Sequence, residues 1–177
     1  MVQTMHNNHK AVQVALGGVL AALAVVILLV GGIIPVGTYV APMLAALPLV
    51  ILLAELPRSL CLGWYCIVAL LGVLLCPDKE TAFVFVFLGW YPLAKPALDR
   101  LPKLPGLLCK LLLFNAAAAA LYALLILVFQ LEALVQEAKE TGTVLLIAML
   151  LLGNLSFFLF DILLEKLTGI YRFKHKK

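Results

Sequence analysis

The chain has 177 residues, of which 65% are hydrophobic and only 12% are charged. A soluble domain of average composition is about half apolar and about a quarter charged, so this chain lacks the polar residues that would cover a water-exposed surface. A membrane-spanning helix takes about 20 apolar residues, and six such helices would leave about 57 residues for all loops and both tails. The composition therefore predicts an all-α integral membrane protein and leaves no room for a separate soluble domain.

The net charge of +4 does not indicate nucleic-acid binding, because the basic residues lie at helix ends rather than on one aromatic-rich face. The four cysteines lie in or beside apolar runs without C-x-x-C spacing, so we expect no disulfide framework. The first apolar stretch is too long for a signal peptide and has no A-x-A-like site after it, so we expect it to be retained as the first span.

Six apolar runs follow one another, and the breaks between them are rich in glycine, proline and charge. Gly31 and Pro35 lie in the first break, and Pro57-Arg58-Ser59 forms the second. The predicted spans are residues 11–34, 40–56, 60–76, 81–98, 107–129 and 144–164, which make residues 1–177 a single transmembrane domain and a compact six-helix bundle.

The fourth run is the shortest, because Thr81 to Leu93 gives only about 13 residues, or about 20 Å of helix. It is expected to be tilted, kinked at Pro92 or extended to Leu98. The run from Phe83 to Leu88 is apolar on every side of a helix, which favours a segment that crosses the membrane over one that lies in water.

The basic residues predict the orientation. If both termini are cytoplasmic, all of the 13 lysines and arginines lie on the inner side except Lys79 and Lys139, which lie on the outer side. A five-span model with the N-terminus outside distributes them nearly as well, so charge alone leaves both models open. The apolar fourth run favours six spans.

Small residues form one face of the first span: Ala11, Ala15, Gly18 and Ala22 are spaced so that they lie along one side of a helix. Small side chains let two helix backbones approach closely inside a membrane. Packing against another span of the same chain is the commoner explanation of such a face. The alternative is that this face docks a separate membrane subunit.

The ionisable residues in the spans lie near the inner ends. Glu55, Lys95 and Asp161 are the three examples, and pairing of an acid with Arg58, Lys95 or Lys110 is favoured over a substrate or proton pathway. Two amides lie deeper. Asn154 is on the same face as Asp161, and Asn115 lies about two turns into the fifth span; each needs a partner, either a neighbouring helix or a ligand.

Polar and aromatic residues assigned to the outer side, together with the deeper Asn154, form the predicted substrate-binding set. Loops folded over the helix ends would supply hydrogen-bonding groups above an apolar pocket, although such residues are also common as solvated caps and interface aromatics. The predicted substrate-binding residues are Thr38, Tyr39, Asp78, Lys79, Glu80, Trp90, Tyr91 and Asn154.

No catalytic centre is predicted. The three histidines, His6, His9 and His175, lie in the tails, so no haem, zinc or histidine-based site is expected within the spans. The sequence has no H-E-x-x-H, G-x-S-x-G or P-loop motif, and Asp161 is the only aspartate within a span. We therefore predict neither an enzyme nor a bound metal or cofactor.

In its size, its six predicted spans, its small-residue first span and its Gly/Pro loop before the second, the chain resembles the S components of energy-coupling factor (ECF) transporters. The matching docking segment is Ala11-x-x-x-Ala15, continued by Gly18 and Ala22. The stretch from Phe87 to Lys95 is similar to one in the uncharacterised clostridial-type subgroup of these proteins. The resemblance implies a multi-pass protein of the bacterial plasma membrane.

The resemblance also implies the partners: a transmembrane coupling subunit, on which the small-residue face docks, and separate ATPase subunits that energise uptake of a vitamin or other micronutrient. The residue patterns associated with thiamin, riboflavin or biotin are not recognisable, so no ligand is assigned. The alternative is a non-transporting scaffold similar to the MreD-like proteins of cell-wall morphogenesis. A stand-alone channel is disfavoured because no polar stripe runs along any span.

Overall fold

The computed structural model describes the backbone of residues 2–34, 37–127 and 143–174, and the side chains of residues 11–34, 37–124, 147 and 150–169. Every regular element in these residues is a helix, which confirms the all-α prediction. The helices are α1 (Val2–Gly31), α2 (Gly37–Glu55), α3 (Arg58–Leu75), α4 (Lys79–Leu88), α5 (Tyr91–Leu98), α6 (Lys103–Leu127) and α8 (Thr143–Lys174). Pro35, Lys139 and the predicted end of the fifth span, residues 128–129, lie outside the described residues.

Within the described residues, five segments are long and apolar enough to cross a membrane: Ala11–Gly31, Gly37–Glu55, Arg58–Leu75, Lys79–Leu98 and Lys103–Leu124. They match the first five predicted spans within a few residues at each end. The chain is therefore a multi-pass membrane protein by the length and composition of its helices. Helix α8 covers the range of the sixth predicted span.

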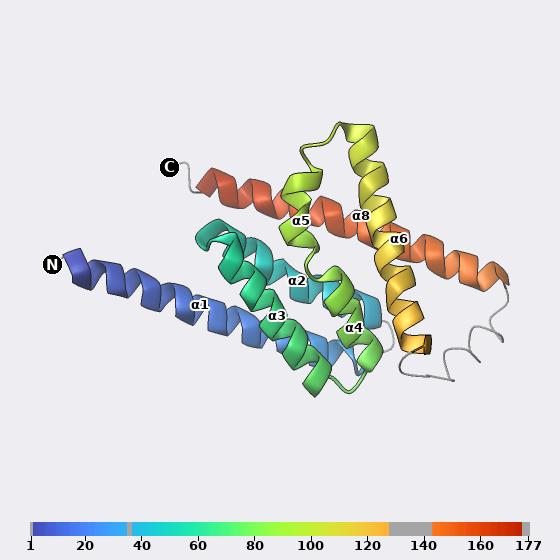
Figure 1. The fold of residues 1–177 in the computed structure, drawn as a ribbon, viewed down its shortest axis with the longest axis horizontal. Coiled ribbons are helices and arrows are strands. Elements are labelled where there is room, and N and C mark those ends of the chain that lie inside the picture. The colour runs from blue at the N-terminus through green and yellow to red at the C-terminus, as the bar shows by residue number, and fades with distance from the viewer. Residues whose placement is uncertain (1, 35–36, 128–142, 175–177) are drawn as a thin grey trace.

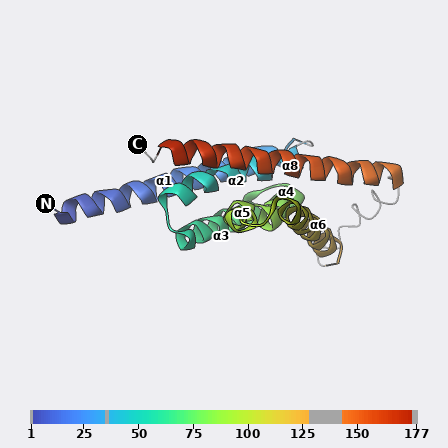
Figure 2. The same cartoon turned by 90° about the horizontal axis from the view of Figure 1, so that it is seen from above.

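The helices form two layers. Figure 2 shows α1, α2 and α8 in one layer and α3, α4, α5 and α6 in the other. Helix α2 is central, because it contacts α1, α3, α4, α5 and α8. The free ends of α1 and α8 extend toward the same end of the molecule (Figure 1).

Close packing of α1 against α2 depends on glycine at the turn between them. A Cβ atom added at Gly31 would overlap the Cβ of Ala41, and one added at Gly37 would overlap the carbonyl oxygen of Gly31. Ala45 and Ala46, one turn further along α2, are also buried. In lipid, small residues of this kind let two helices approach closely, which gives more dispersion contact.

The fourth predicted span is interrupted between α4 and α5. The N–H of Gly89 donates to the carbonyl of Phe85 at 2.7 Å and ends α4, and Pro92 has no N–H with which to continue the helix. A Cβ atom at Gly89 would lie 2.6 Å from that carbonyl oxygen, so the turn requires glycine. The helix resumes and reaches Leu98, which agrees with the predicted kink near Pro92 and with the predicted extension.

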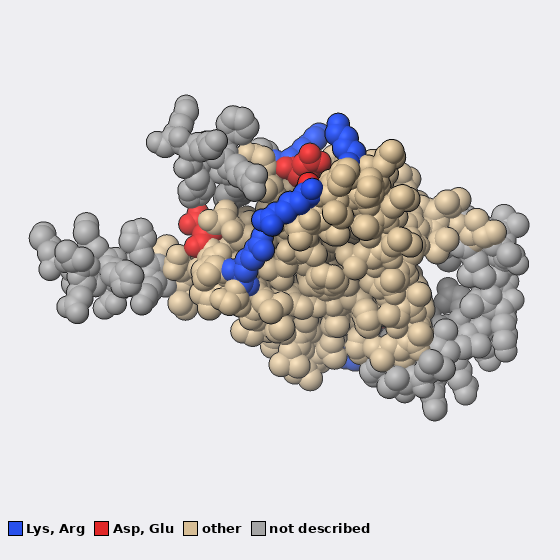
Figure 3. All heavy atoms as spheres, turned by 45° about the horizontal axis from the view of Figure 1, so that its top comes forward, with Lys and Arg blue, Asp and Glu red and all other residues tan. Residues whose placement is uncertain are grey.

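The surface and interior are both apolar, as a lipid environment allows. Leu28, Leu49 and Phe85 are fully buried in the core, while Val14 and Leu112 are 76% and 69% exposed. Figure 3 shows charged side chains gathered toward the end where α5 meets α6, with uncharged residues over most of that face. This end is called the basic end below.

Candidate functional site

The polar side chains in the described bundle form three groups. The basic-end network consists of Tyr91, Lys95, Asp99, Lys110 and Asp161. The acidic-end cluster, at the opposite ends of α2, α4 and α6, consists of Thr38, Tyr39, Asp78, Glu80, Thr81 and Tyr122. The amide pair is Asn115 and Asn154.

Asp161 is the centre of the basic-end network. Its carboxylate accepts hydrogen bonds from the hydroxyl of Tyr91 at 2.6 Å and from the ammonium groups of Lys95 at 2.5 Å and Lys110 at 2.9 Å. Tyr91, Lys95 and Asp161 are all buried, with 2%, 5% and 8% of their surface exposed. The sequence-based prediction that Asp161 pairs with a lysine is confirmed.

Asp99 completes the basic-end network at its exposed edge. One oxygen lies 2.6 Å from the ammonium of Lys110, and the other lies 3.4 Å from that of Lys95. Two lysines and two aspartates therefore balance each other's charge. The network joins α5, α6 and α8, because Lys95 belongs to α5, Lys110 to α6 and Asp161 to α8.

Aromatic rings pack beside this network. The ring of Tyr91 meets that of Phe157 edge-on, with centroids 4.8 Å apart, and Phe157 stacks on Phe114 at 4.7 Å. Such rings exclude water from the neighbouring ion pairs. The attraction between the paired charges is stronger without water, and a charge that lost its partner there would be costly.

The acidic-end cluster depends on hydroxyl groups rather than on cations. The hydroxyls of Tyr39 and Tyr122 lie 2.9 and 3.0 Å from the same oxygen of Glu80 and 2.5 Å from each other. The two phenols have one proton each, so at most two of these three contacts are hydrogen bonds at any moment. The cluster joins α2, α4 and α6.

Asp78 begins α4 as its N-cap. Its carboxylate accepts from the backbone N–H groups of Glu80 at 3.0 Å and Thr81 at 3.1 Å, as expected of an aspartate at the start of a helix. It also accepts from the hydroxyl of Thr38 at 3.5 Å. The ammonium of Lys79 donates to the carbonyls of Val73 and Cys76 and so caps the end of α3.

The structure thus brings together four of the predicted substrate-binding residues, Thr38, Tyr39, Asp78 and Glu80, with Lys79 beside them. Trp90, Tyr91 and Asn154 lie elsewhere. Sequence reasoning missed Tyr122 and Asp99. A tyrosine next to an alanine run was the signal for Tyr122, and the i, i+4 spacing from Lys95 was the signal for Asp99.

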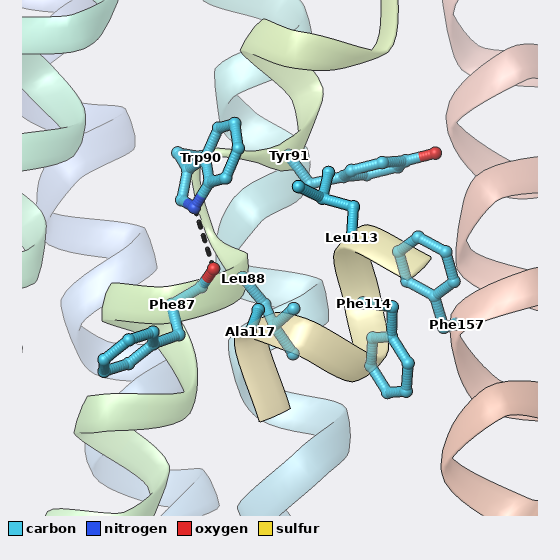
Figure 4. Close-up of a pocket in the computed structure, with 8 residues that line it drawn as sticks. All are labelled: Phe87, Leu88, Trp90, Tyr91, Leu113, Phe114, Ala117 and Phe157. Carbon is cyan, nitrogen blue, oxygen red and sulfur yellow. Dashed lines mark hydrogen bonds between the residues drawn. The ribbon is translucent and has the colours of Figure 1, made fainter. Parts of the chain in front are cut away.

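Trp90 and Tyr91 lie at the interruption between α4 and α5 (Figure 4). The indole of Trp90 donates to the carbonyl of Phe87 at 2.8 Å and closes that turn. The cavity beside them has a volume of about 10 Å³, which is about the space of one water molecule. Its lining is Phe87, Leu88, Trp90, Tyr91, Leu113, Phe114, Ala117 and Phe157.

The amide pair connects α6 and α8. The Asn115 amide donates to the Asn154 oxygen at 2.8 Å, and the Asn154 amide donates back to the Asn115 oxygen at 3.2 Å. Each amide also donates to a carbonyl one turn earlier in its own helix, those of Leu111 and Leu150. Of the two predicted partners for Asn154, a helix or a ligand, the structure supplies the helix.

The small-residue face of α1 points away from the bundle. Ala11, Ala15, Gly18 and Ala22 are all exposed, and a Cβ atom added at Gly18 would meet no other atom within 4 Å. The opposite side of α1 packs inward, where the carbonyl of Gly17 accepts from the indole of Trp64 at 3.0 Å. Of the two explanations left open for this face, packing against another span of the chain does not occur within the described residues.

A larger hollow lies between α1, α2 and the C-terminal part of α8. It is an open groove of about 350 Å³ and its lining is entirely apolar. The lining residues are Leu20, Leu23, Ile27, Leu44, Leu47, Pro48, Val50, Ile51 and Leu167. Neither Asn154 nor any residue of the acidic-end cluster contributes to it.

In the described part of the chain, no three His, Cys, Asp or Glu side chains come close enough to hold a metal ion. Comparison of the chain with protein-family models, with curated proteins and with solved structures finds no match in any of the three.

Proposed function

We propose that this protein is the substrate-capturing membrane subunit of an ECF-type micronutrient uptake transporter, energised by separate ATPase subunits. The observation that carries the proposal is the outward-facing row of small residues on α1, from Ala11 to Ala22. Such a subunit needs a surface on which a transmembrane coupling subunit can pack.

Lipid contact by itself does not call for small residues, whereas contact between two membrane helices is favoured by them. Bulky valines lie beside the small-residue face: Val12, Val19 and Val26 are 65%, 67% and 53% exposed and are spaced seven residues apart. A ridge next to a shallow groove is the shape into which a partner helix packs. These features support docking of another membrane protein on α1.

In this proposal the bundle has six spans, with α8 as the sixth, and both termini are cytoplasmic in a bacterial plasma membrane. The basic end is then the inner end, in agreement with the positive-inside rule. The extension of α1 and α8 toward one end of the molecule supports an even number of spans.

The acidic-end cluster is the proposed place of substrate capture, on the outer side of the membrane. Tyr39 is 46% exposed there, and the hydroxyls of Tyr39 and Tyr122 together with Glu80 are groups that hydrogen-bond a small polar molecule. A ligand bound at this place would replace the contact between the two phenols.

The test is co-purification of the full chain with the coupling subunit and both ATPases. Ala15→Trp and Gly18→Trp put a large ring on the small-residue face and are expected to abolish assembly, because the helix backbones can no longer approach. Leu112→Trp is the matched control, since Leu112 is 69% exposed on α6 and lies outside both the small-residue face and the valine ridge of α1. Normal assembly of both face variants, when these two variants and the control are all folded, would contradict the docking proposal.

A second candidate function is a non-transporting scaffold similar to MreD-like proteins. It is favoured by the way in which the acidic-end groups and the amide pair bond to one another, and by the apolar lining of both hollows. Mass spectrometry of the natively purified protein separates the two candidates. A retained small molecule with coupling and ATPase subunits supports the transporter, while cell-wall synthesis proteins without a small molecule support the scaffold.

A further inference from the structure

The segment from Lys95 to Lys110, which joins α5 to α6, has more positive than negative charge. It contains the basic residues Lys95, Arg100, Lys103 and Lys110 and the single acid Asp99. Lys95 and Lys110 are paired with Asp99 and Asp161 in the basic-end network, where two positive and two negative charges cancel. Arg100 and Lys103 therefore carry the surplus charge of this segment.

Arg100 and Lys103 have no charged partner within the described chain. Both side chains are exposed, and neither makes an ion pair or a side-chain hydrogen bond in the part of the chain that the structure describes. One guanidinium group and one ammonium group, three residues apart in the sequence, are thus available to an external anion.

The loop that carries these two residues is held in one conformation. Asp99 connects Lys95 at the end of α5 to Lys110 on α6, so both sides of the loop are fixed to one carboxylate. Backbone hydrogen bonds from Arg100 to Ala97 at 3.3 Å, from Leu101 to Leu98 and from Gly106 to Pro102 order the turns between them. A ligand would bind this loop with little loss of conformational freedom.

Exposed leucines alternate with the two cations. Leu101, Leu104 and Leu108 are 42%, 76% and 60% exposed. In a membrane protein such side chains lie in hydrocarbon, while arginine and lysine at a helix end extend toward the lipid headgroups. The loop therefore presents an apolar surface and two cations side by side at the level of the membrane interface.

We propose that the α5–α6 loop and the first turn of α6 bind an anionic phospholipid, with Arg100 and Lys103 on its phosphate and Leu101 and Leu104 against its acyl chains. Arginine binds phosphate oxygens through two N–H groups, and lysine adds a second point of charge. A phospholipid combines the phosphate and the hydrocarbon that this surface matches, whereas an acidic protein segment would leave the leucines uncovered. This inference depends on the membrane location of the helices and not on the transport proposal.

The experiment uses the full chain in nanodiscs of phosphatidylcholine with increasing phosphatidylglycerol, followed by native mass spectrometry of the released protein. The wild type is expected to retain phosphatidylglycerol in preference to phosphatidylcholine. The double variant Arg100→Gln/Lys103→Gln is expected to lose that preference by about tenfold or more, since each cation near a membrane surface contributes about fivefold in affinity for an anionic lipid. The charge-preserving variant Arg100→Lys/Lys103→Arg should keep most of the preference.

The matched control is Arg58→Gln/Lys166→Gln, which removes the same charge from exposed positions outside the α5–α6 loop. An equal loss in both double variants would mean a general attraction of the protein's exposed basic residues for anionic lipid and would overturn the proposed site. Absence of any preference in the wild type would also overturn it. Complete displacement of the lipid by millimolar inorganic phosphate would assign the site to free phosphate instead.

Discussion

The two ends of the bundle satisfy their carboxylates by different chemistry. At the basic end, Asp161 is buried among two lysines and a tyrosine. At the acidic end, Glu80 accepts from two phenol groups, and the ammonium of Lys79 hydrogen-bonds to backbone carbonyls rather than to either acid. One end is neutralised by ion pairs, while the other keeps its negative charge and stabilises it by hydrogen bonds.

This difference has a physical consequence. Ion pairs shielded from water are strong but require every partner, so the basic end is expected to be rigid and intolerant of single changes. Hydrogen bonds among half-exposed hydroxyls exchange more easily with water or with a ligand, so the acidic end is expected to rearrange at lower cost. The basic end is therefore expected to be the rigid end of the bundle, and the acidic end the adaptable one.

The largest expected effect is that of Asp161→Asn. Loss of this carboxylate leaves Lys95 buried with only the longer contact to Asp99, and breaking a buried ion pair costs about 3–5 kcal/mol. The free energy of unfolding, measured by denaturant titration in mixed micelles, is expected to fall by that amount. Glu165→Gln, four residues along α8 and exposed, is the control and should change it by less than about 0.5 kcal/mol.

The triple variant Tyr91→Phe/Lys95→Met/Asp161→Leu removes one positive and one negative charge together with the hydroxyl that donates to Asp161, and it leaves the pair of Lys110 and Asp99. Its stability is expected to recover to near the wild-type value, since apolar replacement of a whole buried pair is often neutral. If Asp161→Asn and Glu165→Gln behave alike, the basic end is not the rigid end.

A smaller effect is expected at the acidic end. Tyr122→Phe removes one hydroxyl from Glu80 and leaves that of Tyr39 in place, so we expect a loss of about 1–2 kcal/mol. Tyr39→Phe should cost less, because the Tyr39 side chain is more exposed. The same denaturant titration measures both. A loss at Tyr122 as large as that at Asp161 would remove the distinction between the two ends.

The amide pair lies between the two ends and should contribute less again. Asn115→Leu and Asn154→Leu each leave one amide without its partner, while the double variant removes both. A double-mutant cycle is expected to give a coupling free energy of about 0.6 kcal/mol and at most about 1.7 kcal/mol, as for hydrogen bonds between membrane helices. Additive single effects would mean that the two amides do not stabilise the contact of α6 with α8.

The smallest effect concerns the reactivity of Cys76, which is buried at the end of α3 near the acidic end. Burial raises the pKa of the Cys76 thiol above its ordinary value, and a hydrogen bond from the Asp78 backbone offsets only part of that rise. Because the thiolate is the reactive form, alkylation near neutral pH should be slow and should accelerate only above the usual pH range. Mass spectrometry of the detergent-solubilised protein after iodoacetamide treatment should find the exposed Cys66 and Cys109 modified before Cys76. Equal rates would indicate that the acidic end opens widely.

Features that depend on local composition were predictable. The apolar runs and the Gly/Pro breaks gave segment boundaries close to those of α2 and α3, and Pro92 marked the interruption before α5. The pairing of Asp161 with Lys95 was also predictable, because both residues lie near the same membrane interface, where an acid finds a base. In each case the signal lies in the order and type of neighbouring residues.

Features that depend on helix rotation were not predictable. Tyr91 was grouped with the outer residues but bonds to Asp161, 70 positions away in the chain. Tyr122 meets Glu80 across 42 positions. For the small-residue face of α1, packing inside the chain and docking outside it were both open, and among the described residues the face points outward. No periodicity distinguishes these outcomes, because both sides of the helices are apolar.

The amino-acid sequence by itself determined that lipid is the solvent of this protein, that its elements are helices and where those helices are broken. Composition, proline and glycine act locally, so they have the same effect in any arrangement of the helices. The tertiary structure decided which polar groups meet and which face of α1 remains uncovered. In lipid the hydrophobic effect does not orient a helix about its axis, so close packing and hydrogen bonding between helices make that choice.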